Sequence, residues 1–362
     1  MRHELRTLTS LRGIAAWFVV LYHIRLSVAG LAPGAVALFA KGYLAVDFFF
    51  LLSGFVIWLS WGDRLRKEGW RGVPAFLHKR IARVWPLHLV MLAGAVALAL
   101  LLVGTGHATP DDYPFAQLPL HVLLLQNWGF TDHLAWNDPS WSISCELGAY
   151  LLFPLLTLAI DWKRVPTAAV IGAGAALLIL LHAVMAESGT TNLGFDIARF
   201  GLRRCMLEFA CGTMIGALWW RWRNTPRLPG WTAAAISVAL LLLWAGGTMP
   251  ETLAIPGAFA AGLLAFALSS GRKGNPLEAD WLHYLGEISY ATYLSHFLLF
   301  VAFKLALVSD ARAIPPILIA LYLAMVLMAS ITLHHLVERP AQKWVNRLRL
   351  PILTRERRHT AR

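Results

Sequence analysis

The chain has 362 residues, of which 58% are hydrophobic and only 14% are charged. Soluble domains average about 45–50% apolar and about 25% charged residues, so a soluble globular protein is excluded. The net charge of +12 would suit a nucleic-acid-binding protein, but the basic residues stand in short segments between apolar runs, which argues for membrane topology and against nucleic acid. The three cysteines fit neither a disulfide framework nor a metal motif, so no metal is expected.

Long apolar runs predict an all-α, polytopic membrane protein that is embedded in membrane lipid. A spanning helix needs roughly 20 apolar residues, and about ten stretches approach that length. The first stretch runs on to His23 without a cleavage site, so it is expected to stay as a helix. The predicted spans are residues 8–28, 43–61, 84–104, 140–160, 165–185, 199–219, 231–247, 252–270, 286–308 and 314–337.

The positions of lysine and arginine predict which side each loop faces. Basic residues cluster before the first span, in 62–83 and in the tail, whereas the longest opposite segment, 105–139, has none. Both termini are therefore predicted to face the cytoplasm. We divide the chain into a transmembrane domain, 1–345, and a basic cytoplasmic tail, 346–362. Segment 105–139 is expected to receive an acceptor, and its apolar part, 118–128, is too short to cross and is predicted to be re-entrant or interfacial.

Two residues at the ends of the first span are candidates for catalysis. Arg12 and His23 are close to three helical turns apart, so they share a helix face at about 16 Å along the axis. A titratable side chain in a membrane helix usually faces a protein interior or a wet cavity and marks a functional site. Histidine can take and return a proton near neutral pH. The alternative is a helix-end anchor for Arg12 and a hydrogen-bonded core histidine.

Two arginines at the cytoplasmic start of the third span are candidates for binding an anionic ligand. Arg80 and Arg83 lie at i and i+3, on one helix face, and arginine pairs bind phosphate groups well. Anchoring at the inner leaflet is the alternative. Asp47 stands among phenylalanines and needs a partner or a proton when buried. The neighbouring Ser53-Gly54 pair suits close helix packing.

Further polar residues lie near other predicted helix ends. Glu146 is about one and a half turns into the fourth span and is predicted at the depth of His23, where it can orient the ring or share its proton. A structural pair with an arginine is the alternative. The sixth span has arginines near its outer end, although the positive-inside bias disfavours basic residues there. The ninth span has a stripe of polar residues, which interhelical hydrogen bonding would also explain. The candidate acceptor-binding residues are Asn127, Ser144, Arg203, Arg204 and His296.

Together these stretches resemble the acyltransferase 3 family of bacterial membrane proteins. The family's motif of arginine, ten residues and histidine is matched at Arg12 and His23, and its Arg-x-x-Arg pair at Arg80 and Arg83. A run similar to Gly-Val-Asp-Phe-Phe-Phe-x-x-Ser-Gly-Phe is matched at 45–55, with alanine in place of the glycine. Three more motifs match: Trp-Ser-x-Ser-x-Glu at 141–146, Ser-Tyr-x-x-Tyr-Leu-x-His at 289–296, and Glu-x-Pro, expected to close the last helix, at 338–340.

The resemblance implies a multi-pass O-acyltransferase of the bacterial inner membrane, in the class that transfers groups other than aminoacyl groups. It would move an acetyl or other short acyl group from acetyl-CoA or another acyl-CoA, bound at the cytoplasmic side, to a hydroxyl of a sugar, a glycan or a lipid-linked sugar. His23 would be the general base. The other implied roles are orientation of that base by Glu146 and Arg12, proton relay by Asp47, and coenzyme A binding by Arg80 and Arg83.

Several alternatives stay open at this point. The acceptor can attack the thioester directly, which we favour, or the acyl group can first pass to the histidine. The acceptor can also be a cytoplasmic small molecule such as a macrolide, and the protein can form a homodimer. A transporter or flippase is the rival from another functional class, because charged residues would then line a translocation path. No repeated pair of broken helices is evident, which argues against it.

Overall fold

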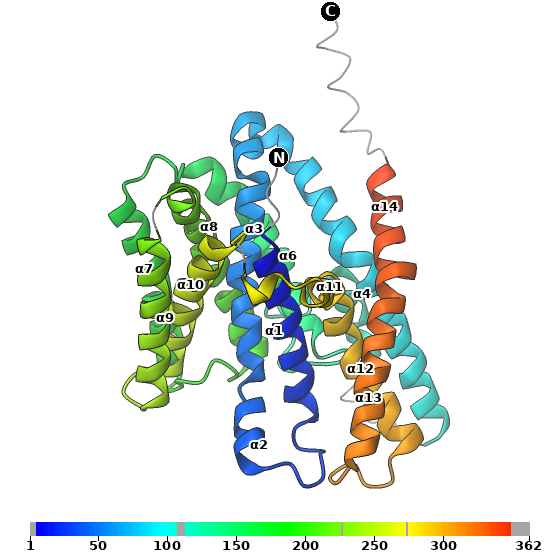
Figure 1. Cartoon of the computed structure of the whole chain (residues 1–362). Coiled ribbons are helices and arrows are strands. Elements are labelled where there is room, and N and C mark those ends of the chain that lie inside the picture. Colours follow the sequence, from blue (N-terminus) through cyan, green and yellow to red (C-terminus); the bar gives the residue numbers. More distant parts are fainter. Residues whose placement is uncertain (1–4, 107–112, 226, 273, 349–362) are drawn as a thin grey trace, which may run out of the picture.

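The apolar runs fold into helices that lie side by side in one bundle (Figure 1). The structure is a computed structural model and describes residues 5–106, 113–225, 227–272 and 274–348. Within those residues it contains helices and turns but no β-strand, which confirms the predicted all-α class. The helices are α1 (Arg6–Ile24), α2 (Pro33–Phe39), α3 (Ala45–Glu68), α4 (Val73–Gly104), α5 (Leu118–Leu123), α6 (Ser140–Ala159), α7 (Thr167–Ala186), α8 (Ile197–Trp222), α9 (Leu228–Ala245), α10 (Glu251–Ser269), α11 (Asp280–Glu287), α12 (Ser289–Leu307), α13 (Pro316–Leu333), the π-helical turn η5 (His334–Glu338) and α14 (Arg339–Arg347).

Eight segments of the described chain are long and apolar enough to cross a membrane. Together they overlap nine of the ten predicted spans. One segment, Pro33–Gly104, includes both α3 and α4, and each of the other seven overlaps one span. The remaining predicted span is α8, which is not among them. The helices are therefore those of a polytopic membrane protein, whereas the number of spans and the sidedness of the termini stay predictions. Residues 349–362 of the predicted basic tail lie outside the described part of the chain.

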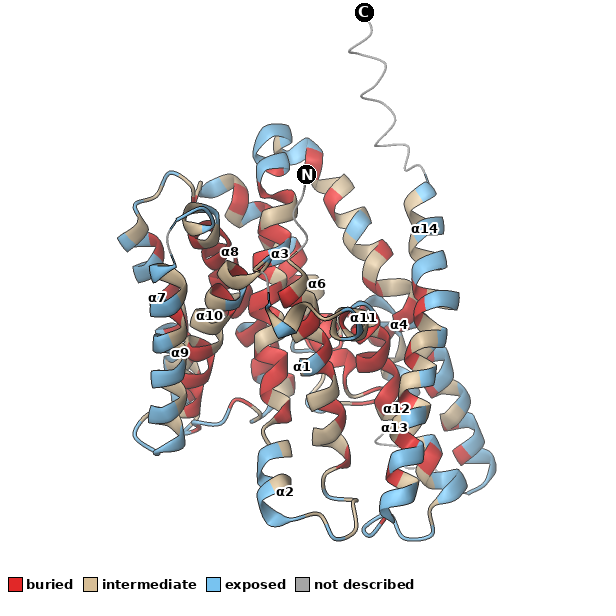
Figure 2. Cartoon of the chain, viewed as in Figure 1, coloured by how far each residue is buried: buried red, intermediate tan, exposed pale blue. Residues whose placement is uncertain are grey.

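The core lies where α3, α6 and α8 meet, and buried residues gather in the centre of the bundle (Figure 2). The backbones of α3 and α8 come close at Gly54. A Cβ atom at that position would stand 2.0 Å from the carbonyl oxygen of Phe209, so the contact requires glycine. The close packing predicted for Ser53-Gly54 is therefore confirmed. By contrast, α9 lies at the edge of the bundle, and most of its apolar side chains are exposed.

The segment between α4 and α6 folds back into the bundle after the short helix α5. Leu124 has a left-handed backbone with φ of +58° and is fully buried. The side chains of Gln126 and Asn127 that follow are buried too. Asn137 donates from Nδ2 to the carbonyl of Leu294 on α12 at 2.9 Å. Residues 118–128 thus form a short helix and a buried turn that pack into the bundle, and their re-entrant or interfacial position in the membrane stays a prediction. Residues 107–112 of the expected acceptor-binding segment lie outside the described part.

The last helix continues past its predicted end at residue 337. α13 passes through η5, and α14 then runs to Arg347. A proline inside a helix lacks an N–H and its ring meets the preceding turn, which is why the Glu-x-Pro motif was expected to end this one. A π turn is wider than an α turn, and it stands directly before Pro340, so the ring is accommodated. As a result Glu338 turns into the protein, where it is buried.

Candidate active site

A cavity of about 910 Å³, part of it open to solvent, lies between α1, α3, α4, α6 and α12. α3 gives it an apolar wall that includes Val46, Phe49 and Phe50. Polar residues from four other helices complete the wall; motif spacing sets which residues share a face within each helix, and helix packing brings the four faces together. The polar lining residues are Arg12, Arg80, Arg83, Ser142, Glu146, Tyr150, Ser289, Tyr290 and Tyr293, together with Ser53 of α3.

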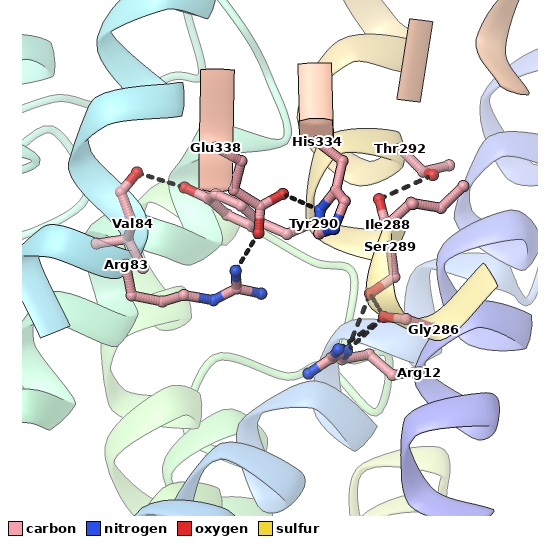
Figure 3. Close-up of polar contacts among 10 residues, drawn as sticks. All are labelled: Arg12, Arg83, Val84, Gly286, Ile288, Ser289, Tyr290, Thr292, His334 and Glu338. Atoms are coloured by element: carbon pink, nitrogen blue, oxygen red, sulfur yellow. Dashed lines mark hydrogen bonds and ion pairs between the residues drawn. The ribbon is translucent and has the colours of Figure 1, made fainter. Parts of the chain in front are cut away.

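The two arginines of α4 both line the cavity but differ in their partners. Arg83 forms an ion pair with Glu338, whose other carboxylate oxygen lies 3.0 Å from Nδ1 of His334 (Figure 3). The guanidinium of Arg83 also lies over the ring of Tyr290, 5.4 Å from its centroid. Arg80 makes no hydrogen bond or ion pair with any described residue, and its Nε is buried without a partner. Arg80 is therefore a cavity-lining cation without a partner among the described residues, and it is available to an anionic ligand.

Arg12 lines the cavity from α1 and is fixed to the junction of α11 and α12. Its Nη2 donates to the carbonyl of Gly286 at 2.6 Å and its Nε to Oγ of Ser289 at 2.9 Å (Figure 3). A Cβ at Gly286 would clash with the carbonyl of Thr9, so glycine is what lets α11 approach α1 this closely. Arg12 thus keeps its charge at the cavity wall with no carboxylate partner among the described residues.

Glu146 also lies in the cavity wall, away from the histidine whose ring it was expected to orient. Its Oε1 accepts a hydrogen bond from Oγ of Ser53 at 2.5 Å. His23 does not line this cavity, and no hydrogen bond joins it to Glu146 in the described structure. Glu146 shares the cavity wall with Arg12, and the depth beside His23 that counting turns predicted has no contact to support it among the described residues.

The structure instead brings His23 together with His296 of α12. Nδ1 of His23 lies 3.1 Å from Nε2 of His296 and 3.0 Å from the carbonyl oxygen of Val19. Nδ1 of His296 lies 3.1 Å from the carbonyl oxygen of Thr292. His296 is fully buried, and His23 is partly buried. Both residues were singled out from the sequence, but their pairing was not predicted, because nothing in the sequence places α1 beside α12.

Two aromatic residues stand at the end of the cavity that is nearest this histidine pair. The ring of Tyr293 lines the cavity and lies 6.2 Å from the ring of His296, centroid to centroid. Phe49 meets Tyr293 edge to face at 5.9 Å. The Tyr293 hydroxyl and Oγ of Ser142 are 2.8 Å apart and share a hydrogen bond. Tyr293 therefore links the cavity wall to the ring of His296.

Asp47 and Arg204, predicted as a proton relay and as an acceptor-binding residue, are each other's partners. Nη2 and Nε of Arg204 donate to Oδ1 of Asp47 at 2.6 and 3.1 Å. Both side chains are buried in the α3–α8 interface, and neither lines the cavity. Asp47 thus has the partner that its burial requires. The pair joins positions 157 residues apart, a distance over which the sequence offered no signal.

The remaining predicted acceptor-binding residues lie outside the cavity wall. The hydroxyl of Ser144 donates to the carbonyl of Leu124 at 2.8 Å and accepts from the backbone N–H of Asn127 at 3.1 Å. Nδ2 of Asn127 donates to the carbonyl of Ile197 on α8 at 3.1 Å. These bonds tie the re-entrant segment to α6 and α8. Arg203 is exposed and lies 5.8 Å from the centroid of the Phe200 ring.

Comparison with known proteins shows the family to which this chain belongs. A family model described as an acyltransferase domain matches residues 6–335. The acyltransferase MdmB of Streptomyces mycarofaciens is 29% identical, over 97% of this chain and 95% of its own length. BcsY of Komagataeibacter xylinus, which is named as a membrane-bound transacylase, is 26% identical over 98% of this chain and 87% of its own. Protein 2 in the picA locus of Rhizobium radiobacter is 40% identical, over 29% of this chain and 51% of its own length. No solved structure matches. A family match that covers nearly all the described helices shows that the chain belongs to the acyltransferase 3 family and is a membrane acyltransferase.

Proposed function

We propose that the protein is an O-acyltransferase that moves an acetyl or other short acyl group from acyl-CoA to a hydroxyl of a sugar or glycan. The observation that carries this proposal is one cavity with three arginines in its wall, together with a histidine pair of which the His296 ring lies 6.2 Å, centroid to centroid, from the cavity-lining ring of Tyr293. The protein would act in the bacterial inner membrane, with both termini in the cytoplasm and the donor bound from that side.

The cavity suits an acyl-CoA donor in its charge and in its apolar wall. Arg80 and Arg12 have no carboxylate partner among the described residues, so they are available to the donor's phosphate groups. The apolar face of α3, with Val46 and Phe50, suits the thin pantetheine arm and the acyl group. The donor's polar end would thus stay near α4 while its thioester points toward Phe49.

His23 would act as the general base on the acceptor. As the acceptor oxygen attacks the thioester carbon, Nε2 of His23 takes the hydroxyl proton, and the C–O bond of the new ester forms. The C–S bond then breaks, and the same proton passes to the sulfur that leaves as coenzyme A thiol. Atoms and charge balance without a metal or a redox partner. This route is the direct transfer; an acyl-histidine intermediate would need the same nitrogen as a nucleophile.

Two acceptor classes fit the proposal and require different experiments. A sugar or glycan would approach His23 from the side opposite the donor, so that the acyl group crosses the membrane while coenzyme A stays in the cytoplasm. A cytoplasmic small molecule with a free hydroxyl, such as a macrolide, would share the donor's side. We favour the glycan, because His23 does not line the donor cavity and can therefore meet an acceptor that comes from another direction.

The test is binding and turnover of acetyl-CoA by the purified protein with a panel of sugar glycosides and macrolides as acceptors. We expect wild-type protein to bind acetyl-CoA and to release thiol. Arg80→Ala should weaken acetyl-CoA binding by about tenfold or more, as loss of a charge-assisted contact does. His23→Ala should bind acetyl-CoA normally and lose about a hundredfold or more in turnover.

A matched control is Arg203→Ala, because Arg203 is an arginine of the bundle that neither lines the cavity nor pairs with a carboxylate. It should bind acetyl-CoA as wild type does. If wild-type protein binds no acyl-CoA, the acyltransferase mechanism proposed for this cavity fails at its first step. Transport of the acceptor candidates into proteoliposomes would then test the rival function.

A further inference from the structure

We propose that His296 is a positioning residue for the reaction and acts through His23. Its Nε2 accepts a hydrogen bond from Nδ1 of His23. This bond orients the His23 ring, whose own Nε2 is the basic nitrogen, and stabilises the positive charge that this ring acquires. This role rests on the proposed function of His23 as the general base. A residue of α12 would then contribute to catalysis although it does not line the donor cavity, and motif spacing alone does not assign it this role.

The backbone around the two rings assigns their protons. A carbonyl oxygen can only accept, so Nδ1 of His23, 3.0 Å from the carbonyl of Val19, carries hydrogen. Nδ1 of His296, 3.1 Å from the carbonyl of Thr292, carries hydrogen for the same reason. A neutral imidazole has one N–H, so each Nε2 bears a lone pair. The single Nδ1 hydrogen of His23 is shared between the Val19 carbonyl and Nε2 of His296, which accepts it across 3.1 Å, and Nε2 of His23 is left as the base.

The Val19 carbonyl alone would select this tautomer of His23, so His296 must add something else. Its ring comes from a second helix and fixes the rotation of the His23 side chain, which a bond within α1 does less firmly. When Nε2 of His23 takes up a proton, the ring becomes a cation whose Nδ1–H still points at a neutral nitrogen lone pair. A hydrogen bond to a charged group is stronger than one between neutral groups, so it stabilises the transition state more than the resting state.

The surroundings of His296 favour this indirect role over the direct acceptor contact that the sequence suggested. Its side chain is fully buried and does not line the cavity. Its backbone carbonyl accepts a hydrogen bond from the Tyr322 hydroxyl at 2.9 Å, which holds that turn of α12 in place. The ring of Tyr293 covers it on the side of the cavity, at 6.2 Å between centroids. His296 thus meets the substrates only through the ring of His23.

The experiment replaces His296 by two side chains of similar length. His296→Gln offers an amide oxygen that can accept from Nδ1 of His23, whereas His296→Met offers no comparable acceptor. We expect His296→Met to lower kcat for thiol release from acetyl-CoA by about tenfold to hundredfold and to leave KM for acetyl-CoA unchanged. His296→Gln should recover most of the lost kcat. The control is His88→Met, because His88 is a buried helix histidine that bonds only to the carbonyl of His121.

Two kinetic results would overturn the role of His296. One is wild-type kcat in His296→Met; the other is equal loss in His296→Met and His296→Gln with a matching fall in thermal stability, which is what a packing role produces. Nitrogen NMR of histidine-labelled protein reads the bond without turnover, and it should show coupling between Nδ1 of His23 and Nε2 of His296. If wild-type protein shows that coupling but releases no thiol, the proposed function has failed and the pairing itself stands. If Nε2 of His23 carries the hydrogen, the positioning role is wrong whatever the activity.

Discussion

Two regions inside the bundle hold charged residues that the sequence alone does not distinguish. In the α3–α8 interface, Arg204 and Asp47 are buried and form an ion pair with each other. In the cavity wall, Arg12 and Arg80 keep their charge without a carboxylate partner, and a space of about 910 Å³ lies in front of them. An ionisable residue in a membrane helix marks a functional site by default. A charged residue with a buried partner of opposite charge therefore holds the fold, whereas one without such a partner beside an empty space is available to bind a ligand.

The largest expected effect comes from breaking the buried pair. Arg204→Ala leaves the Asp47 carboxylate buried without its partner, which should lower the free energy of unfolding by about 3–5 kcal/mol. Denaturant unfolding of the detergent-purified protein measures it. Arg80→Ala, in the cavity wall, should unfold at the denaturant concentration of wild type, because no partner is left behind there.

Arg203→Ala, next to Arg204 and exposed, is the control for the helix α8 itself. The double variant Asp47→Ala with Arg204→Ala should lose less stability than the two single variants summed, because neither charge then lacks the other. Should Arg204→Ala prove as stable as wild type, the pair does not hold the fold, and the proton relay predicted for Asp47 would regain support.

A smaller effect, on selectivity rather than stability, is expected where the cavity ends. Phe49 closes the cavity against Tyr293, so Phe49→Ala should lengthen the space that an acyl group can fill. We expect kcat/KM for hexanoyl-CoA, relative to acetyl-CoA, to rise by about tenfold, since each methylene contributes little to discrimination. Phe48→Ala is the matched control, because Phe48 packs against Phe259 and does not line the cavity. An unchanged ratio in Phe49→Ala would mean that another residue limits acyl length.

Sequence reasoning reached much of the fold and part of the site. Local patterns sufficed for the helices and for the cavity positions of Arg80 and Arg83, since spacing within one helix sets which residues share a face. They did not reach the partners of His23 and Asp47, because those partners come from distant helices whose neighbours only packing decides. The π turn at Glu338 was missed for a related reason: besides the contact of Glu338 with His334 inside the turn, it includes an ion pair with Arg83 of distant α4.

The smallest expected effect concerns Glu338, the carboxylate partner of Arg83 in the cavity wall. This ion pair resembles the buried pair of Arg204 and Asp47. A donor phosphate must compete with this carboxylate for Arg83. Glu338→Gln removes the competing charge and keeps the side-chain shape, so it should tighten acetyl-CoA binding by roughly threefold to tenfold, about 1 kcal/mol. Calorimetric titration measures it, with exposed Glu287→Gln as the control. Weaker binding in Glu338→Gln would show instead that the carboxylate aims Arg83 at the donor, because a freed guanidinium would then lose the orientation on which the phosphate contact depends.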